Sequence, residues 1–185
     1  MSDLPPNSAA GTAPLDRAGL LARLAALGIA TATTEHPPLR TVEESQALRG
    51  AIAGAHCKNL FVKDRKDTLF LIVALEDAEI DLKTVHTRIG ASGKVSFGKP
   101  DLLYEVLGVI PGAVTPFGAV NDVAGRVTVV LDAAMMDEPV LNYHPLDNTA
   151  TTTIGRDDLV RFLEAVDHAP RILAISRAAG DADRA

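Results

Sequence analysis

Three short segments of the chain combine residue types that could bind a phosphate, a carbonyl oxygen or an oxyanion. The first is His56-Cys57-Lys58-Asn59, which directly precedes the strand-like run Leu60-Phe61-Val62. An ammonium group at the entrance of a strand can project into a cleft and bind a phosphate or carbonyl oxygen as a compact charge. The same lysine can equally be a solvated side chain at a strand end. Cys57 is a candidate nucleophile, although a lone cysteine commonly behaves as a small buried hydrophobic residue.

A second candidate site is the segment from residue 109 to residue 118, which reads VIPGAVTPFG. Pro111 and Gly112 suit a type II turn, because glycine readily adopts the positive φ that this turn requires. Three residues separate Gly112 from Pro116, and their main-chain N–H groups could face one direction: Ala113, Val114 and Thr115. Aligned amides in a rigid loop can bind an oxyanion or a carbonyl oxygen. The alternative interpretation is an ordinary connection between two elements that contains proline and glycine.

The third candidate segment spans residues 142–149 and reads NYHPLDNT. Pro145 disfavours a helical conformation of the preceding residue, so we expect His144 to have an extended backbone. A neutral imidazole in that place can donate or accept one hydrogen bond and can form part of a pocket wall. Alternatively, His144 is a structural histidine whose ring nitrogens are satisfied, and Asn148 and Thr149 form a local turn.

The sequence lacks the motifs of several common catalytic classes. It contains no Gly-x-x-x-x-Gly-Lys loop, no Gly-x-Gly-x-x-Gly motif and no Gly-x-Ser-x-Gly elbow. Its single cysteine cannot form an internal disulfide, and its five histidines never occur as His-Glu-x-x-His. We therefore expect no metal and no cofactor, with the chemistry carried by main-chain groups, one lysine and one histidine.

The charge of the chain limits its partners. Lysine and arginine number 18 and aspartate and glutamate 24, which gives a net charge of −6. Non-specific nucleic-acid binding depends mainly on neutralising phosphates, so an acidic chain is unsuited to it. A local basic patch could still bind one polyanionic end. Aromatic residues make up only 4% of the chain, which argues against an extended base-stacking surface.

The elements that must position these segments follow from hydrophobic periodicity and from capping and turn residues. We expect helices over residues 16–27, from a capping box at 41–44 to residue 50, over 81–88, from Pro100 onward, and over 157–166. Strand-like runs cover residues 31–35, 59–63, 68–75, 95–97, 126–132 and 149–154. Because these elements interleave without a strict βαβ rhythm, we expect a single mixed α/β domain with a curved, partly antiparallel sheet.

The two ends of the chain differ in composition from its middle. Residues 1–14 are small, polar and rich in proline, which predicts a disordered leader, and residues 177–185 predict a flexible tail. The domain itself is expected over residues 15–176. The longest apolar run, residues 69–75, is far shorter than the ~18 residues of a membrane-spanning helix. With no signal peptide recognised at the start, a cytoplasmic location is expected.

Taken together, the three segments resemble the YbaK-like aminoacyl-tRNA deacylases, which are relatives of the editing domain inserted into bacterial prolyl-tRNA synthetases. The resemblance is carried by KNLFVK at residues 58–63, GAVTPFG at 112–118 and HPLDNT at 144–149. It covers residues 16–175, and the Gly-x-x-x-Pro loop is a signature of the family. The His-Pro-Leu-x-Asn segment points to the freestanding, alanine-specific branch rather than to the cysteine-specific one.

The resemblance implies a mixed α/β fold and hydrolysis of an aminoacyl ester without a metal or cofactor. It implies that Lys58 holds the terminal adenosine of a tRNA, that the loop from Gly112 to Pro116 positions the aminoacyl carbonyl through its amides, and that His144 lines a small amino-acid pocket. Further substrate contacts are implied for other motif residues: Asn59, Lys63, Phe117, Gly118, Asn148 and Thr149. Acceptor-stem contacts are expected from Lys63, Lys83, Arg88, Lys94 and Lys99.

The expected partner is therefore the acceptor end of aminoacylated tRNA(Pro), with prolyl-tRNA synthetase as a second partner, and neither DNA nor a membrane. An ester is already activated, so positioning a water molecule and stabilising the oxyanion could suffice, with a 2′-hydroxyl of the substrate orienting that water. A pocket that admits a methyl side chain can exclude the proline ring. Three alternatives stay open: a cysteinyl-tRNA(Pro) deacylase of the same fold, a non-catalytic module that binds a tRNA end, and a scaffold domain of a synthetase assembly.

Overall fold

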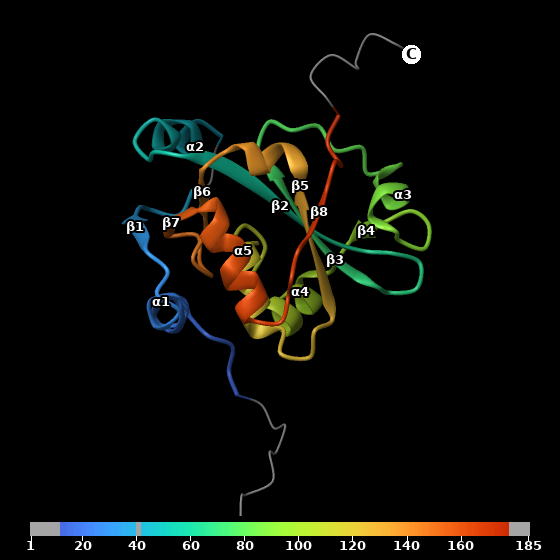
Figure 1. The fold of residues 1–185 in the computed structure, drawn as a ribbon, viewed down its shortest axis with the longest axis horizontal. Helices are drawn as coiled ribbons and strands as arrows, with labels where there is room; N and C mark the ends of the chain where they lie inside the picture. The colour runs from blue at the N-terminus through green and yellow to red at the C-terminus, as the bar shows by residue number, and fades with distance from the viewer. Residues whose placement is uncertain (1–11, 40–41, 178–185) are drawn as a thin grey trace, which may run out of the picture.

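An eight-stranded sheet of mixed direction forms the centre of the molecule (Figure 1). The computed structural model describes residues 12–39 and 42–177. The strands are β1 (Thr31–Glu35), β2 (Ala55–Lys63), β3 (Leu69–Leu75), β4 (Ser96–Phe97), β5 (Val127–Asp132), β6 (Val140–Tyr143), β7 (Ala150–Gly155) and β8 (Arg171–Leu173). The α-helices are α1 (Arg17–Ala26), α2 (Val42–Arg49), α3 (Val85–Ile89), α4 (Pro100–Leu107) and α5 (Arg156–Ala165), and the 3₁₀ helices are η1 (Pro116–Asn121) and η2 (Ala133–Asp137).

The sheet combines antiparallel and parallel pairs in the order β1-β7-β6-β2-β3-β5-β8, and β4 pairs with the end of β2. β2 and β3 form an antiparallel hairpin in which Asn59 pairs with Val73. The pairs β3–β5, β5–β8 and β2–β6 are parallel, whereas β7 is antiparallel to both β1 and β6. The mixed α/β architecture expected from the interleaved sequence pattern is therefore confirmed.

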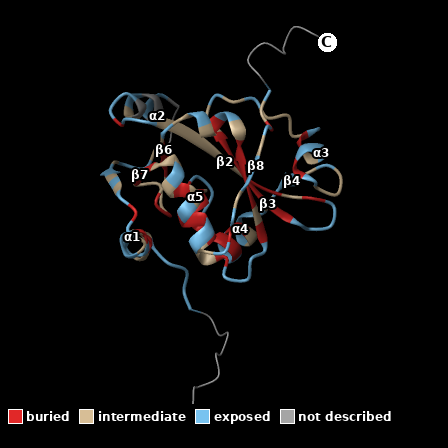
Figure 2. Cartoon of the chain, in the orientation of Figure 1, coloured by how far each residue is buried: buried red, intermediate tan, exposed pale blue. Residues whose placement is uncertain are grey.

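The central strand β3 buries both of its faces. Leu69, Leu71 and Val73 pack into one hydrophobic core, while Phe70 and Ile72 pack into a second core on the opposite face. Successive strand residues point to opposite faces, so an uninterrupted apolar run suits a strand that is covered on both sides. The larger core receives α1, α4, α5 and η1, and the smaller core receives α3; Figure 2 shows buried residues along the central strands.

Two helices follow the sequence prediction closely. Asp16 caps α1 by accepting a hydrogen bond from the N–H of Gly19 at 2.9 Å, and the helix buries Leu20 and Leu24. α4 begins at Pro100, where the missing N–H of proline has no helical acceptor to lose. Its buried stripe is the expected one: Leu103, Val106 and Leu107.

Other elements differ from the prediction. β2 begins at Ala55 rather than at Asn59, because its first residues pair with the unexpected strand β6. The helix predicted over residues 81–88 is confined to α3, because Asp81 accepts a hydrogen bond from the N–H of Lys83 and forms a turn there. β8 was not predicted either. The helix cap predicted at Thr41 lies outside the described residues.

Both ends of the described chain contact the domain. The N–H of Leu15 donates to Oδ1 of Asn121 at 2.8 Å, and the N–H of Arg177 donates to the carbonyl oxygen of Glu79 at 3.0 Å. Within residues 12–39 and 42–177, no helix has the length and apolar character needed to cross a membrane.

Candidate active site

A small cavity of about 90 Å³ opens beside β2, β6 and β7, which lie side by side in the sheet. β2 contributes Cys57 and Asn59 to its wall, and the start of β7 contributes Thr151. The loop that follows β6 contributes His144. Two side chains that the sequence placed in separate segments, Asn59 and His144, therefore line the same cavity.

A hydrogen bond to the first residue of β7 fixes the tautomer of His144. Its Nδ1 lies 3.0 Å from the carbonyl oxygen of Ala150. A carbonyl can only accept, so Nδ1 carries the proton and the lone pair of Nε2 is left as an acceptor. Burial lowers the pKa of His144 below its ordinary value of 6.5, although the hydrogen bond to Ala150 opposes this effect. At neutral pH the cavity wall therefore carries a neutral imidazole.

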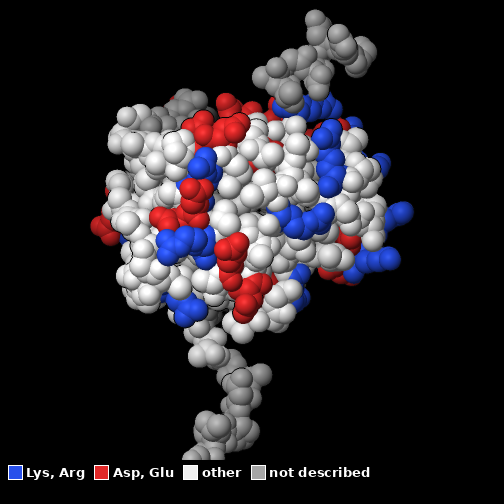
Figure 3. Space-filling view, in the orientation of Figure 1, with Lys and Arg blue, Asp and Glu red and all other residues white. Residues whose placement is uncertain are grey.

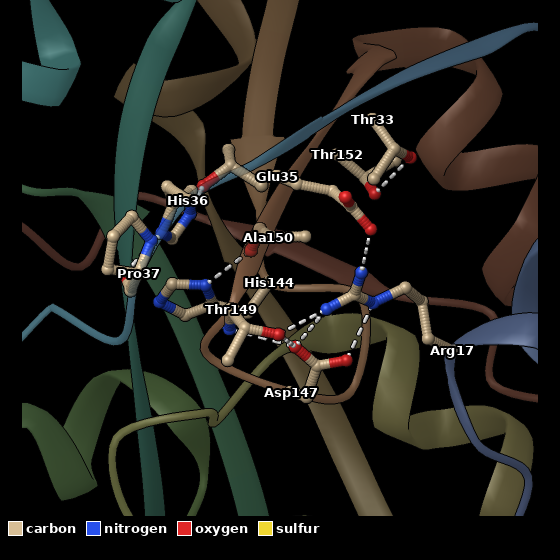
Figure 4. Close-up of polar contacts among 11 residues, drawn as sticks. Arg17, Thr33, Glu35, His36, Pro37, His144, Asp147, Thr149, Ala150 and Thr152 are labelled. Atoms are coloured by element: carbon tan, nitrogen blue, oxygen red, sulfur yellow. Dashed lines mark hydrogen bonds and ion pairs between the residues drawn. The ribbon is translucent and has the colours of Figure 1, made fainter.

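A second histidine stands beside the first. The ring centroids of His36 and His144 are 6.2 Å apart (Figure 4). Nδ1 of His36 donates to the carbonyl oxygen of Pro37 at 2.9 Å, and its Nε2 lies 2.9 Å from Oγ1 of Thr151. Sequence reasoning did not select His36 as a site residue. The signal was present, because both histidines directly precede a proline.

Cys57 and Asn59 reach the cavity from the same face of β2, since alternate strand residues share a face. Oδ1 of Asn59 is buried and makes no hydrogen bond within the described part of the chain. A buried acceptor without a donor is unfavourable, and it marks a place where a bound molecule can donate. Burial raises the pKa of the Cys57 thiol to about 11, so its sulfur stays protonated at neutral pH. Cys57 thus behaves as a half-buried thiol packed against the core rather than as an activated nucleophile.

The turn at Pro111 and Gly112 forms as predicted. Gly112 has a φ of +90°, and the N–H of Ala113 donates to the carbonyl oxygen of Ile110 at 3.0 Å. This hydrogen bond closes a type II turn, and it also occupies the N–H of Ala113. The expectation of three aligned free amides is corrected accordingly. Within the described residues, two N–H groups of the loop have no acceptor: that of Val114, which is partly exposed, and that of Thr115, which is buried.

The residues after this turn support it from the core. Oγ1 of Thr115 accepts a hydrogen bond from the N–H of Phe117 at 3.2 Å, and η1 begins at Pro116. Phe117 is fully buried between the rings of Tyr143 and Phe162, with centroid distances of 5.9 and 5.5 Å. We expected Phe117 and Gly118 to contact a substrate. Both are buried, so they form the packed base of the loop instead.

The loop over residues 144–149 approaches the same turn. Nδ2 of Asn148 lies 3.9 Å from the position that a Cβ would occupy on Gly112. Leu146 has a φ of +71°, a conformation that costs a non-glycine residue roughly 1–3 kcal/mol. The Asp147 carboxylate accepts hydrogen bonds from the N–H and the hydroxyl of Thr149, at 2.8 and 2.6 Å. The second and third sequence motifs are therefore neighbours in the fold, and the third contains a strained turn at Leu146.

The family profile of the aminoacyl-tRNA editing domain matches residues 36–162, a span that contains the cavity, the Gly112 turn and the 144–149 loop. The chain belongs to this family.

Curated relatives agree with this assignment to the editing-domain family. The prolyl-tRNA editing protein ProX of Acetoanaerobium sticklandii is 37% identical over 147 residues, covering 79% of this chain and 89% of that protein. The prolyl-tRNA synthetase associated domain-containing protein 1 of Danio rerio is 38% identical over 168 residues, covering 89% of this chain and 91% of that protein. A solved protein described as a candidate trans-editing enzyme for prolyl-tRNA synthetase has a TM-score of 0.67 at 19% identity, covering 88% of this chain and 98% of that one, and thus shares the fold.

In this editing domain Lys58 does not line the small cavity. Lys58 and Asn59 are neighbours on β2, so their side chains project to opposite faces of the sheet. Nζ of Lys58 donates to the carbonyl oxygen of Ala78 and lines a separate open depression. Other charged residues of that depression are the carboxylates Asp77, Glu79 and Asp81 and the cations Lys83 and Arg177.

A third hollow lies between the cavity and the Lys58 depression. It shares His56 and Glu76 with the cavity, and it shares Asp77 with the depression. The three hollows therefore follow one another along the surface beside β2 and β3. A ligand longer than an amino acid could occupy the cavity and extend toward Lys58.

Basic side chains lie at the far end of β2 and in the segment over residues 82–100. Lys63, at the other end of β2, pairs with Asp67 at 2.6 Å. The segment over residues 82–100 contains no acidic residue and holds four exposed cations: Lys83, Arg88, Lys94 and Lys99. In Figure 3, basic side chains gather along the edge that carries α3 and the β2–β3 turn.

The chemistry available at the cavity is that of hydrogen-bond donors and acceptors. The described residues contain no group of three or more His, Cys, Asp or Glu side chains that could hold a metal ion. The cavity wall holds a neutral imidazole and a buried amide oxygen, which are suited to position a water molecule, whereas the loop from Gly112 to Pro116 is not among the described residues that line the cavity.

Proposed function

We propose that this chain is a trans-editing deacylase that hydrolyses the ester of alanine mischarged onto tRNA(Pro). The observation that carries the proposal is the small cavity of about 90 Å³, whose wall holds the neutral imidazole of His144 and the buried amide of Asn59. A cavity of this size suits a small acyl group, and its polar atoms suit the ammonium and carbonyl groups of an aminoacyl ester. The names of the curated relatives support a role in prolyl-tRNA editing.

The reaction requires no protein nucleophile. A water molecule attacks the acyl carbon, the bond between that carbon and the ribose oxygen breaks, and the ribose oxygen takes up a proton as it leaves. His144 lines the cavity, and its Nε2 is an acceptor at neutral pH; this atom is proposed to orient the water, together with a ribose hydroxyl of the substrate. The N–H group of Val114, a partly exposed residue of the loop, is proposed as a donor to the oxyanion, a role in which one lost donor typically costs ~10²–10³ in rate.

Selectivity follows from size. The cavity wall includes Tyr143, which is fixed by its contact with the buried ring of Phe117. A rigid wall can admit the methyl group of alanine and exclude the ring of proline, as in the second site of editing enzymes. Hydrolysis of the correctly charged tRNA would then be avoided on steric grounds.

The tRNA end is proposed to lie along the hollows between the cavity and Lys58. The ammonium of Lys58 would hold the terminal adenosine, and the exposed cations of residues 82–100 would contact the acceptor stem. Three carboxylates share the Lys58 depression, so this contact is expected to be local rather than a broad electrostatic attraction. A cytoplasmic location and an association with prolyl-tRNA synthetase are part of the same proposal.

A panel of mischarged tRNAs tests the proposal. The chain is incubated with alanyl-, cysteinyl-, seryl- and prolyl-tRNA(Pro), and the initial rates of deacylation are compared. Alanyl-tRNA(Pro) is expected to be hydrolysed fastest and prolyl-tRNA(Pro) to be spared. Faster loss of cysteine would make the chain a cysteinyl-tRNA(Pro) deacylase, and binding of the tRNA without any deacylation would make it a binding module.

A further inference from the structure

The guanidinium group of Arg17 connects α1 to the loop over residues 144–149 (Figure 4). Nε donates to Oδ2 of Asp147 at 2.7 Å, and Nη2 donates to Oδ1 at 2.6 Å, so the pair is bidentate. The same Nη2 donates to Oγ1 of Thr149, and Nη1 donates to Oε1 of Glu35 at 3.0 Å. One side chain of α1 thus contacts the end of β1 and two residues of the loop.

Asp147 is the centre of this network. Its Oδ1 accepts hydrogen bonds from the N–H and the hydroxyl of Thr149 in addition to that from Arg17. The hydrogen bond from Arg17 is the main reason why the pKa of Asp147 is lowered to about 2, so the ion pair persists throughout the neutral range. A bidentate pair of this kind fixes both distance and orientation, which a single ammonium group cannot do.

Leu146, which directly precedes Asp147, has a strained backbone conformation. Leu146 has a φ of +71°, and its side chain is buried in the larger core. A leucine stays in this region only when its surroundings hold it there. Core packing holds the Leu146 side chain, and Arg17 holds the carboxylate that follows it. Two loop residues lie on either side of this turn: His144, which lines the cavity, and Asn148, whose Nδ2 lies near Gly112.

We propose that Arg17 and Asp147 are positioning residues, whose ion pair fixes the turn at Leu146 and thereby sets where His144 stands in the cavity wall. The inference rests on the proposed function, because the position of His144 decides the size of the acyl cavity. Arg17 lies outside residues 36–162, the part that the family profile matches. A helix beyond the matched domain therefore takes part in selecting the acyl group.

Deacylation rates test the effect on selectivity. The Arg17→Met substitution is expected to lower the rate on alanyl-tRNA(Pro) by about 10–100-fold, the cost of misplacing a reacting group by about 1 Å. The ratio of the alanyl rate to the prolyl rate should fall as well, because a loosened wall excludes proline less well. Arg17→Lys keeps the charge but not the bidentate geometry, so its deacylation rate should lie between those of the original chain and of Arg17→Met. The matched control is Arg126→Met, which breaks the exposed pair with Glu105 at 2.6 Å and should leave both rates unchanged.

A double-mutant cycle separates positioning from general stability. If Arg17 acts through His144, then Arg17→Met lowers the rate less in a His144→Gln background than in the original chain. All rates are measured at a temperature at which each variant is fully folded. The proposal would be overturned if Arg17→Met lowered the rate by the same factor in both backgrounds. It would also be overturned if Arg17→Met left the ratio of the alanyl rate to the prolyl rate unchanged.

Amide hydrogen exchange gives a readout that needs no substrate. In Arg17→Met, the N–H of Thr149 is expected to exchange about tenfold faster, which corresponds to ~1.4 kcal/mol, while amides of β3 and β5 keep their rates. Arg17→Lys should show a smaller increase at Thr149. Equal exchange at Thr149 in all variants would refute the positioning role even if the chain is an active deacylase. Faster exchange in a chain that deacylates no tRNA would support the positioning role and refute the proposed function.

Discussion

His144 belongs to the loop that also carries Asn148, and its Nδ1 donates a hydrogen bond of 3.0 Å to the carbonyl oxygen of Ala150, the first residue of β7. This hydrogen bond fixes the tautomer of the ring, because the carbonyl has no proton to give. Two titratable groups act electrostatically on the ring: His36, whose ring centroid is 6.2 Å away, and Asp147 in the same loop; Glu76 lines the same cavity. The acceptor in the cavity wall is therefore Nε2, and it exists only while the imidazole is neutral.

The rate of deacylation is expected to depend on pH through His144. Burial disfavours the imidazolium and lowers the pKa of His144 below 6.5, so the acceptor should persist at pH values where an ordinary histidine is half protonated. We expect kcat/KM for alanyl-tRNA(Pro) to be level from pH 8 down to about 6.5 and to fall only at lower pH. His144→Gln should lower the rate and abolish this acid limb. An acid limb that survives in His144→Gln would assign the titration to another group.

Cys57→Ser is expected to keep most of the deacylation activity. The pKa of the thiol is raised to about 11, chiefly by burial, so the reactive thiolate is scarce at neutral pH. The rate should stay within about threefold of the original, and mass spectrometry of the enzyme during turnover should detect no acyl-thioester. A trapped acyl-thioester that disappears together with activity in Cys57→Ser would contradict the proposed mechanism.

Lys58→Ala is expected to weaken the handling of tRNA without weakening the fold. The loss of a charged hydrogen bond to the tRNA end should lower kcat/KM by about 10–100-fold, which corresponds to ~1.5–3 kcal/mol. If the contact is to a phosphate, the slope of log affinity against log salt should become shallower by about 0.7–0.9. The melting temperature should change little, because Lys58 is half-exposed in an open depression.

The control for Lys58→Ala is Lys66→Ala, which removes an exposed cation in the β2–β3 turn. It should alter neither the rate nor the salt slope by a comparable amount. A large loss of melting temperature in Lys58→Ala with intact activity would give the hydrogen bond to Ala78 a structural role only.

Elements with strong local signals could be predicted from the sequence, whereas elements defined by distant partners could not. Pro100 and a stripe of apolar residues indicate α4, and an unbroken apolar run indicates β3. β6 is four residues long, contains Asn142, and is a strand because it pairs with β2 and β7. β8 is similar, since its only strand partner within the described residues is β5. Hydrogen bonds between segments far apart in sequence leave no periodic trace in either segment.

Of the residues that the sequence selected, Asn59 and His144 line the cavity, whereas Lys58 lines a separate depression. The strand period of two was enough to separate Lys58 from Asn59, and the type II turn was enough to show that the N–H of Ala113 is occupied. Both consequences follow from rules available at the sequence level. Arg17 was not predictable in this way, because nothing in α1 indicates that its side chain reaches residue 147.

The stability of the domain is expected to depend on pH through a buried pair of His168 and Asp122. Nε2 of His168 lies 2.9 Å from Oδ2 of Asp122, and Nδ1 lies 2.7 Å from the carbonyl oxygen of Val166, with both side chains 2% exposed. Two acceptors require two ring protons, so the histidine is an imidazolium. Its hydrogen bond to Asp122 raises the pKa of His168 above 6.5. Burial opposes ionisation of Asp122, but hydrogen bonds from His168, Arg126 and Val127 lower its pKa below 3.8.

The raised pKa of His168 stabilises the folded state fully below pH 6.5, and this contribution is lost as the pH rises through the folded-state value. The lowered pKa of Asp122 stabilises it above pH 3.8, and that contribution is lost as the pH falls through its folded-state value. The pair should therefore stabilise the fold most between pH 3.8 and 6.5. His168→Gln should lower the free energy of unfolding by about 3–5 kcal/mol at pH 6, because it leaves a buried carboxylate unpaired. Urea unfolding from pH 5 to pH 9 measures the free energy of unfolding of both proteins. The original chain should lose stability above pH 6.5, and His168→Gln should not. If the two proteins instead lose stability in parallel as the pH rises, this pair does not govern the pH dependence.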